Sequence, residues 1–447
     1  MKGTTSSHRS HLYDAIVVGA GPAGSTFAEA LARASFRVAL LEEHEQVGVP
    51  KHCSGLVSPR ALEIAGVSPE VMGLQEYRQA RVWAPGGGTL WLRSDSVQAI
   101  AIERDCFDQA LAQRAVDAGA ELMLSTRARH FQREDSRIAI QATTPRGEIC
   151  LHAPLLVGAD GATSRVARWM GASGKREVIP AIKADVTFTS GGTDTIEILV
   201  GSGVAPGWFG WVIPLPGRRA TIGMGATGSP RVHFPAFLDI VRRRFGDLSL
   251  DSTHSAPIPL GPARDFVGDD VLLIGAAAHQ TKPTTGGGVY LGIRAAQLAA
   301  YVAAHALTRV RAGSQHALSR RALAPYEEAW QRQEGRSRRR APPAQRLPPP
   351  LRPRPRLDRR RRSPALGTAP HLTPGGHRLS RPTPVSPAAR LAAQPTSQAL
   401  AAGPWPPHHG ASERVHLQDR RSGARARERD PPIAPTPKPT AASPWQG

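Results

Sequence analysis

A glycine-rich turn between two short apolar runs constrains the fold of this 447-residue chain more than any other feature. The turn, Gly19–Gly24 (GAGPAG), fits the pattern G-x-G-x-x-G. It follows an apolar, β-branched run at Tyr13–Gly19, and the apolar residues of Pro22–Ala34 then have helical spacing. A second apolar run at Arg37–Leu41 completes a strand–helix–strand unit, which is the building block of parallel sheets.

The residues of this turn have the properties needed to hold a dinucleotide. Gly19 permits a tight turn, Gly21 lets the backbone approach a pyrophosphate, and Gly24 allows close contact between helix and strand. Pro22 and Ala23 open the helix, whose N-terminus stabilises negative charge. The sequence therefore predicts a dinucleotide site at this turn.

An acidic residue supports the same interpretation. Glu42 lies 18 residues after Gly24, at the end of the next predicted strand. Its carboxylate can accept hydrogen bonds from a ribose and would repel a 2′-phosphate. A Gly-rich loop without a ligand is the alternative, but the strand, the helix and the acid together favour the dinucleotide.

The pattern further along the chain predicts an α/β fold with two sheets. A helix at Arg104–Ala118 and buried strands at Leu155–Gly158 and Val271–Ile274 extend the nucleotide-binding domain, and strands between Ile179 and Leu260 indicate an inserted mixed sheet. The predicted boundaries are 11–75, 98–170 and 265–306 for the nucleotide-binding domain, 76–97 and 171–264 for the inserted domain, 307–335 for a C-terminal helical segment and 336–447 for a disordered tail.

The net charge of +21 is concentrated in this tail. Residues 336–447 contain 21 Arg, one Lys and five acidic residues, a net charge of +17, which leaves +4 for residues 1–335. The tail has 23 Pro and a single Ile, too little apolar surface to offset its chain entropy. Two explanations remain open: a frameshift near Gly335 has replaced and truncated native C-terminal helices, or the tail is a natural arm that binds anionic lipid or nucleic acid.

Composition argues against several classes of protein. No apolar run reaches the ~18–20 residues needed to span a bilayer, and the run Ala15–Ala20 is too short for a signal segment. The three cysteines, Cys53, Cys106 and Cys150, include no Cys-x-x-Cys pair, which argues against a disulfide framework and structural zinc. We expect a cytoplasmic protein with no metal site, and the modest charge outside the tail argues against nucleic acid as a partner.

Three further segments resemble those of FAD-dependent oxidoreductases of the aromatic-hydroxylase-like superfamily. The sequence RDCFD, beginning at Arg104, looks like the R-x-x-F-D segment, whose arginine lies near the flavin. GADG matches the D-G segment with Asp160 and Gly161, and GDDVLLIG, ending at Gly275, resembles the start of the G-D-A-A segment. The resemblance implies FAD as the cofactor, and hence a Rossmann-type FAD-binding domain with an inserted mixed β-sheet substrate domain.

Two more stretches are similar to the geranylgeranyl reductase family, namely Gly48–Leu56 (GVPKHCSGL) and Gln280–Tyr290 (QTKPTTGGGVY). That family has P-x-x-Y-x-W-x-F-P along a lipid tunnel, and Pro206–Pro214 keeps both prolines and the tryptophan, with Phe209 for Tyr and Ile213 for Phe. The resemblance covers residues 13–335. It implies a reductase that uses reduced FAD to saturate isoprenoid C=C bonds of a geranylgeranyl-type lipid or a prenyl quinone.

The resemblance also implies roles for individual residues. Cys53 holds the position proposed in the family for the proton donor that faces the flavin across the alkene, and a thiol is mostly protonated at neutral pH. The alternative is that Cys53 only packs, as a small and soft side chain. Gly286, Gly287 and Gly288 precede a long helix whose N-terminus can stabilise negative charge on reduced flavin.

The expected substrate contacts and one departure from the family follow from the same comparison. Phe209, Trp211 and Pro214 would contact the prenyl chain, although aromatic residues on strands are more often ordinary core. Ala276 stands where G-D-A-A has an aspartate that binds the ribityl chain of the flavin. Loss of a charge-assisted hydrogen bond costs about 1.5–3 kcal/mol, so we expect weakened FAD binding.

The implied partners are a prenyl lipid or prenyl quinone as substrate, NADPH or a ferredoxin-type protein as electron donor, and the inner membrane surface. The oligomeric state remains open. A flavin-dependent monooxygenase or halogenase is an alternative function, because Phe209–Pro214 lacks only the first Trp of the halogenase pattern W-x-W-x-I-P. A degenerate, inactive flavoprotein-like product is the alternative that is not an enzyme.

Overall fold

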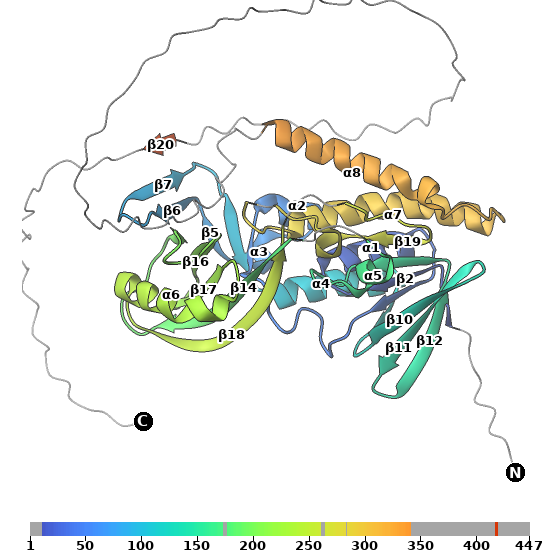
Figure 1. Ribbon diagram of the computed structural model, residues 1–447, viewed down its shortest axis with the longest axis horizontal. Coiled ribbons are helices and arrows are strands. Elements are labelled where there is room, and N and C mark those ends of the chain that lie inside the picture. The colour runs from blue at the N-terminus through green and yellow to red at the C-terminus, as the bar shows by residue number, and fades with distance from the viewer. Residues whose placement is uncertain (1–10, 173–176, 261–263, 283, 341–415, 419–447) are drawn as a thin grey trace, which may run out of the picture. The chain divides into compact units, whose positions relative to one another are not determined.

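The computed structural model describes residues 11–172, 177–260, 264–282, 284–340 and 416–418, and all of them belong to one compact unit (Figure 1). The strands of this part form four sheets. The helices are α1 (Pro22–Arg33), α2 (Pro59–Ala65), α3 (Pro69–Met72), α4 (Arg104–Asp117), α5 (Arg165–Trp169), α6 (Pro230–Phe245), the 3₁₀ turn η1 (Gly275–Ala278), α7 (Val289–Arg311) and α8 (Arg320–Arg340).

A five-stranded parallel sheet forms the nucleotide-binding part of the fold. Its strand order is β19-β13-β2-β3-β9, and every neighbouring pair is parallel. Four of these short strands, β2, β3, β13 and β19, are apolar and almost entirely buried, as parallel strands covered on both faces require, whereas the edge strand β9 is partly exposed. Their bounds are β2 Ala15–Val18, β3 Val38–Leu41, β9 Glu121–Met123, β13 Leu155–Gly158 and β19 Val271–Leu273.

The carboxyl ends of these strands bring the predicted cofactor residues to one edge of the sheet. β2 leads into Gly19, β3 into Glu42, β13 into Asp160 and β19 into Gly275. In open parallel sheets ligands bind outside this edge, where the strand order reverses. β2 is the central strand, with β3 and β9 on one side and β13 and β19 on the other.

Helix α1 packs against α4 and α7, and α8 packs on α7. The apolar residues of α1, among them Phe27 and Leu31, are fully buried, so the helical spacing seen in the sequence marks the face of α1 toward the sheet. Pro22 occupies the first turn, where its missing N–H costs nothing, and the helix ends before Ser35, which has φ of 61°.

Two smaller sheets flank the parallel sheet. One has the order β1-β12-β11-β10, in which β10, β11 and β12 form an antiparallel meander and β1 pairs in parallel with β12. The other, β4-β8-β5, is antiparallel and precedes α4. The bounds are β1 His11–Leu12, β10 Arg127–Glu134, β11 Arg137–Thr144, β12 Gly147–Ala153, β4 Leu56–Val57, β5 Gly73–Tyr77 and β8 Ala99–Ile102.

The predicted inserted sheet is an eight-stranded mixed sheet with the order β18-β14-β17-β16-β15-β6-β7-β20. All neighbours are antiparallel except β15 and β6. Helix α6 covers one face of this sheet (Figure 1), and its own side chains Phe237, Leu238 and Val241 pack against the strands. The bounds are β6 Gln79–Trp83, β7 Thr89–Arg93, β14 Val178–Phe188, β15 Ile196–Val200, β16 Phe209–Pro214, β17 Arg219–Gly225, β18 Leu248–Pro259 and β20 His416–Gln418.

The structure bears on two sequence-based expectations. Helix α7 begins at Val289, directly after Gly286–Gly288, and Gly286 has φ of 70°, which an α-helix does not allow. Within the segment predicted as a disordered tail, residues 336–340 continue α8, and residues 416–418 pair with β7 as β20. The rest of the predicted tail, 341–415 and 419–447, lies outside the described residues.

Candidate functional site

The glycine turn has the geometry that its sequence predicts. Gly19 has φ of 102°, and a Cβ atom there would lie 2.6 Å from the carbonyl oxygen of Ala159. A Cβ atom at Gly24 would lie 1.9 Å from the carbonyl oxygen of Gly19. Both positions therefore exclude any side chain, because the turn, α1 and the end of β13 touch through their backbones.

Gly21 differs from its two neighbours because it faces open space. It is the N-cap of α1, with φ of −69°, and a Cβ atom there would meet no atom within 4 Å. No side chain caps the first turn of α1, where Pro22 and Ala23 lie. The free N–H groups and the helix dipole at this opening suit a phosphate.

Glu42 is held beside the turn. Its Oε2 accepts a hydrogen bond from the backbone N–H of Ala20 at 3.1 Å, and its Oε1 accepts one from the backbone N–H of His44 at 3.1 Å. The His44 Nδ1 lies 2.7 Å from the same Oε1. Glu42 is only 9% exposed, so its carboxylate is positioned at the end of β3 before any ligand arrives.

Asp160 shapes the loop that follows β13. Its carboxylate accepts hydrogen bonds from the Ser164 hydroxyl at 2.6 Å and from the backbone N–H groups of Arg165 at 2.6 Å and Val166 at 3.2 Å. Burial raises the pKa of Asp160, against the effect of these donors. At Gly161, the next residue, an added Cβ atom would meet no atom within 4 Å. The structure therefore shows Asp160 fixing the start of α5 next to the glycine turn.

Gly275 begins the η1 turn after β19 and contacts the glycine turn. A Cβ atom at Gly275 would lie 2.9 Å from the Cβ of Ala23. The backbone N–H of Gly275 donates to Gln280 Oε1 at 2.7 Å, and Gln280 Nε2 donates to the Tyr326 hydroxyl at 2.7 Å. Helix α8 thus holds the η1 turn in place, a role that the sequence did not reveal for Gln280 or Tyr326.

The segment Gly286–Gly288 leads into the N-terminus of α7 and contacts the large sheet. A Cβ atom at Gly286 would lie 2.9 Å from Ile258 Cγ2 and 3.9 Å from Trp208 Cζ2, so the loop lies against the large sheet. Gly287 is exposed, and Gly288 is the N-cap of α7 without a side-chain cap. A flat ring can approach this backbone because no side chain projects from it.

Cys53 lies on a loop that is attached to the start of α4. Its sulfur interacts with the guanidinium of Arg104, and Arg104 Nε and Nη2 donate to Asp108 at 3.0–3.1 Å. Lys51 Nζ lies 3.0 Å from Glu103 Oε2 and 2.9 Å from Asp105 Oδ2. Glu103, Arg104 and Asp105 therefore hold this loop through Lys51 and Cys53, and Asp108 holds Arg104 in place.

The same loop also contacts the large sheet. Lys183 on β14 donates from Nζ to the carbonyl oxygen of Lys51 at 3.4 Å and lies 2.8 Å from Asp185 Oδ1. Lys183 is 5% exposed and the Asp185 side chain is 34% exposed, so the pair is buried on the lysine side only. The loop that carries Lys51 and Cys53 thus lies between α4, through Arg104, and β14, through Lys183.

The predicted substrate residues lie on β16 and are not equivalent. Phe209 and Trp211 share one face of the strand, with ring centroids 6.2 Å apart, and Trp208 stacks on Phe209 at 5.1 Å. Strand alternation puts Pro214 on the other face, with Gly210 and Val212. The carbonyl oxygen of Pro214 accepts a hydrogen bond from the Tyr77 hydroxyl.

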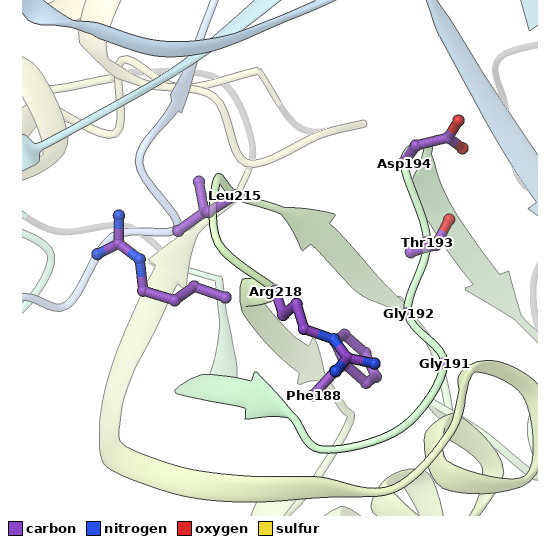
Figure 2. A pocket seen from close by; sticks show the side chains of 8 residues that line it. Phe188, Gly191, Gly192, Thr193, Asp194, Leu215 and Arg218 are labelled. Carbon is purple, nitrogen blue, oxygen red and sulfur yellow. The ribbon is translucent and has the colours of Figure 1, made fainter. Parts of the chain in front are cut away.

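A hollow of about 450 Å³ lies elsewhere on the large sheet (Figure 2). Its lining comes from the loop between β14 and β15 and the turn between β16 and β17, and Figure 2 shows Arg218 over Phe188 with Asp194 across the opening. None of the predicted site residues lines it. We therefore assign the site to the edge of the parallel sheet and not to this hollow.

Comparison with known proteins agrees with this geometry. Residues 12–317 match the model of a family described as an FAD binding domain. A digeranylgeranylglycerophospholipid reductase of Methanopyrus kandleri is 32% identical over 73% of this chain and 84% of its own length. This chain belongs to the geranylgeranyl reductase family. The predicted family and FAD cofactor are confirmed, and the chain is an FAD-dependent oxidoreductase by descent.

Solved structures support the fold of this family member. A geranylgeranyl bacteriochlorophyll reductase-like protein of Thermoplasma acidophilum has a TM-score of 0.66 and 24% identity over 72% of this chain and 84% of its own. A flavin-dependent brominase has a TM-score of 0.59 and 19% identity over 71% of this chain and 85% of its own. At these identities the likeness concerns the fold, and it confirms the predicted α/β architecture with its mixed second sheet.

The described residues fit FAD as this family would bind it. The open space at Gly21, the uncapped start of α1 and the fixed carboxylate of Glu42 suit a pyrophosphate and a ribose. The side chain of Ala276, in the η1 turn, provides no hydrogen-bond acceptor where the family pattern has a carboxylate. The fit is therefore complete at the nucleotide end and reduced at the η1 turn.

Proposed function

We propose that this protein saturates isoprenoid C=C bonds of a geranylgeranyl-type lipid or a prenyl quinone. The Methanopyrus kandleri relative named above is a digeranylgeranylglycerophospholipid reductase, which supports this substrate class. The observation that carries the proposal is the position of the loop with Cys53. Cys53 interacts with Arg104 at the start of α4, and Lys51 of the same loop contacts Lys183 on β14 of the large sheet. A proton donor in this place can reach an alkene held between the cofactor and the sheet.

The proposed chemistry divides between the cofactor and Cys53. When bound in its reduced form, FAD would supply the hydride for one carbon of the double bond. The Cys53 thiol then gives its proton to the other carbon and is left as a thiolate. Arg104 would stabilise that thiolate, because its guanidinium interacts with the Cys53 sulfur. Burial would lower the pKa of this guanidinium, but Asp108 and Cys53 raise it above its usual value. The guanidinium therefore remains charged throughout turnover.

We assign substrate binding to the large sheet, that is, to residues 76–97 and 171–264. Phe209 and Trp211 would line the path of the prenyl chain, because they share one face of β16. Trp208 stacks on Phe209 and lies next to Gly286, so this group of rings extends to the Gly-rich loop before α7. The indole Nε1 atoms of Trp208 and Trp211 are buried and have no hydrogen-bond partner in the described part of the chain. Pro214 would shape the end of β16 without touching the substrate.

A lipid substrate also implies work at a membrane. No helix in the described residues is long and apolar enough to cross one. We propose a cytoplasmic protein that acts peripherally at the inner membrane, with NADPH or a ferredoxin-type protein as its electron donor. Supplying each donor to the purified protein with FAD would identify which one reduces the flavin.

Mass spectrometry of membrane lipids and quinones after expression tests the reaction. The expected result is a gain of two mass units for each saturated bond. Cys53→Ala should abolish this gain while flavin still becomes reduced, because only the proton is lost. Cys106→Ala is the matched control, since Cys106 is an exposed thiol on α4. Full activity of Cys53→Ala would refute the assigned proton donor, and unchanged lipids with the intact protein would refute the reaction.

A flavin-dependent monooxygenase or halogenase is the second candidate. Its support is the segment Phe209–Pro214 and the likeness of fold to the brominase. O₂ consumption that depends on an aromatic substrate would favour this candidate over the reductase. An inactive product would show neither activity, and the absence of thermal stabilisation by FAD would identify it.

A further inference from the structure

Five side chains on the large sheet form one continuous stack of alternating arginine and tryptophan, here called the Arg–Trp stack. Its order is Arg93, Trp91, Arg81, Trp83 and Arg244. The guanidinium carbons lie 4.3–4.9 Å from the centroids of the rings they cover. The first four come from one face of the paired strands β6 and β7, and Arg244 comes from the last turn of α6.

The middle of the stack is fixed and electrically neutral. Glu197, which is fully buried, accepts hydrogen bonds from Arg81 Nε at 2.9 Å, Trp83 Nε1 at 2.7 Å and the Thr193 hydroxyl at 2.8 Å. Arg81 is therefore paired, and its position sets those of both tryptophans. A rigid centre of this kind orders the outer arginines in advance, which lowers the side-chain entropy that they lose on binding.

The two ends of the stack are charged and exposed. Arg93 and Arg244 both lie at the surface, and neither has a carboxylate partner among the described residues. Arg243 is a further exposed cation next to Arg244. Asp194, at the rim of the hollow in Figure 2, is the exposed carboxylate that influences Arg81. The stack thus presents unpaired positive charge at its ends with half-buried indole rings between them.

This combination matches the surface of an anionic bilayer. Guanidinium groups bind phosphate in two-point contacts, and tryptophan rings with one apolar and one polar part favour the headgroup level of a membrane. Nucleic acid fits less well, because base stacking needs a free ring face. Each tryptophan of the stack already has an arginine on both faces.

We propose that the Arg–Trp stack is the surface by which this protein docks on anionic phospholipid. The proposal rests on the proposed function in choosing a bilayer, because a prenyl lipid must be taken from one. The outer edge of β7 pairs with β20 and is therefore not free. The contact surface is the face of the β6–β7 hairpin that carries the Arg–Trp stack.

Binding of the full-length protein to vesicles tests the proposal without any turnover. The probe is vesicles of phosphatidylcholine with phosphatidylglycerol, compared with phosphatidylcholine alone, in a co-sedimentation assay. The variant is Arg93→Gln with Arg244→Gln. We expect binding to anionic vesicles to fall about 30-fold, because two surface cations contribute about 1 kcal/mol each.

A matched control removes the same charge elsewhere. Arg137→Gln with Arg146→Gln changes two exposed arginines at the ends of the β11–β12 hairpin, and the tail is present in all proteins compared. We expect less than a threefold effect for this control. Equal losses for the two variants, or wild-type binding that ignores phosphatidylglycerol, would overturn the proposal.

Two further measurements separate the remaining outcomes. A 30-fold loss of binding to double-stranded DNA with no loss on vesicles would assign the stack to nucleic acid and overturn the lipid proposal. Melting temperatures equal to that of the wild type would show that the exposed substitutions leave the fold intact. If lipids remain unreduced in the mass-spectrometric assay but vesicle binding depends on the stack, the reaction fails while the docking surface stands.

Discussion

Gly21 and Gly24 offer a paired test of the cofactor site, because alanine at the two positions meets different surroundings. A Cβ atom at Gly24 would lie 1.9 Å from the carbonyl oxygen of Gly19 and 3.1 Å from the Cβ of Ala159. At Gly21 it would meet no protein atom within 4 Å. Gly24→Ala therefore disturbs the protein itself, whereas Gly21→Ala disturbs only what binds there.

The magnitudes follow from these distances. Relief of the Gly24 contact requires the backbone of α1 or of the turn to move by more than about 1 Å, and such overpacking costs about 1–3 kcal/mol or more. That corresponds to a fall in melting temperature of about 6 °C at 3 kcal/mol. Gly21→Ala should change the stability of the FAD-free protein by less than about 1 kcal/mol, as expected at an N-cap. Its Cβ would displace a phosphate from backbone N–H groups, which weakens FAD binding about 10- to 150-fold.

Thermal unfolding with and without FAD, together with titration of the flavin, measures both quantities. Gly24→Ala should lower the melting temperature in either condition. Gly21→Ala should lower it only where FAD is present, because the bound cofactor no longer stabilises the folded state. If Gly21→Ala retains wild-type affinity for FAD, or destabilises the FAD-free protein as much as Gly24→Ala does, the assignment of the opening at Gly21 to the pyrophosphate is refuted.

Two other substitutions have opposite expected effects. Ala276→Asp should raise the affinity for FAD about 10- to 150-fold in the same titration, and an unchanged flavin content on purification would contradict it. Asp185→Asn should cost about 1–3 kcal/mol at neutral pH, because it leaves the buried Lys183 without its carboxylate, while solvent at the partly exposed Asp185 limits the loss. Burial would raise the pKa of Asp185, but Lys183, Ser252 and Thr221 lower it below its usual value. The stability from Asp185 is therefore present above about pH 4 and lost as pH falls below it, so denaturant unfolding should show a flatter acid limb in Asp185→Asn.

The parts of the site that depend on local sequence could be predicted. The glycine turn combines three local constraints in six residues, so Gly19, Gly21 and Gly24 each have the geometry that their positions required. Glu42 follows for the same reason, since its distance along the chain is set by one helix and one strand. Helix α7 begins directly after Gly286–Gly288, as the change from glycines to helical spacing predicts.

The parts that depend on distant partners could not be predicted. Gln280 and Tyr326 are 46 residues apart, and nothing in either segment signals their hydrogen bond. Strand β18 alternates polar residues and contains Pro257 and Pro259, which are signals against a strand. It forms because it is an edge strand that pairs along the whole length of β14. The Arg–Trp stack likewise needs β6, β7 and α6 together, so its spacing in the sequence carries no pattern.

The strand order of the parallel sheet sets the order in which the protein can be completed during synthesis. β2 and β13 are adjacent in the sheet, and β19, the outer neighbour of β13, ends at Leu273. Seven strands of the large sheet, from β6 to β18, lie before β19 in the chain. Seven of the eight strands of the large sheet are therefore synthesised while the side of β13 that later receives β19 is still open. A break in the coding sequence ahead of β19 would leave that edge of the parallel sheet unpaired and would remove Gly275 from the end of β19.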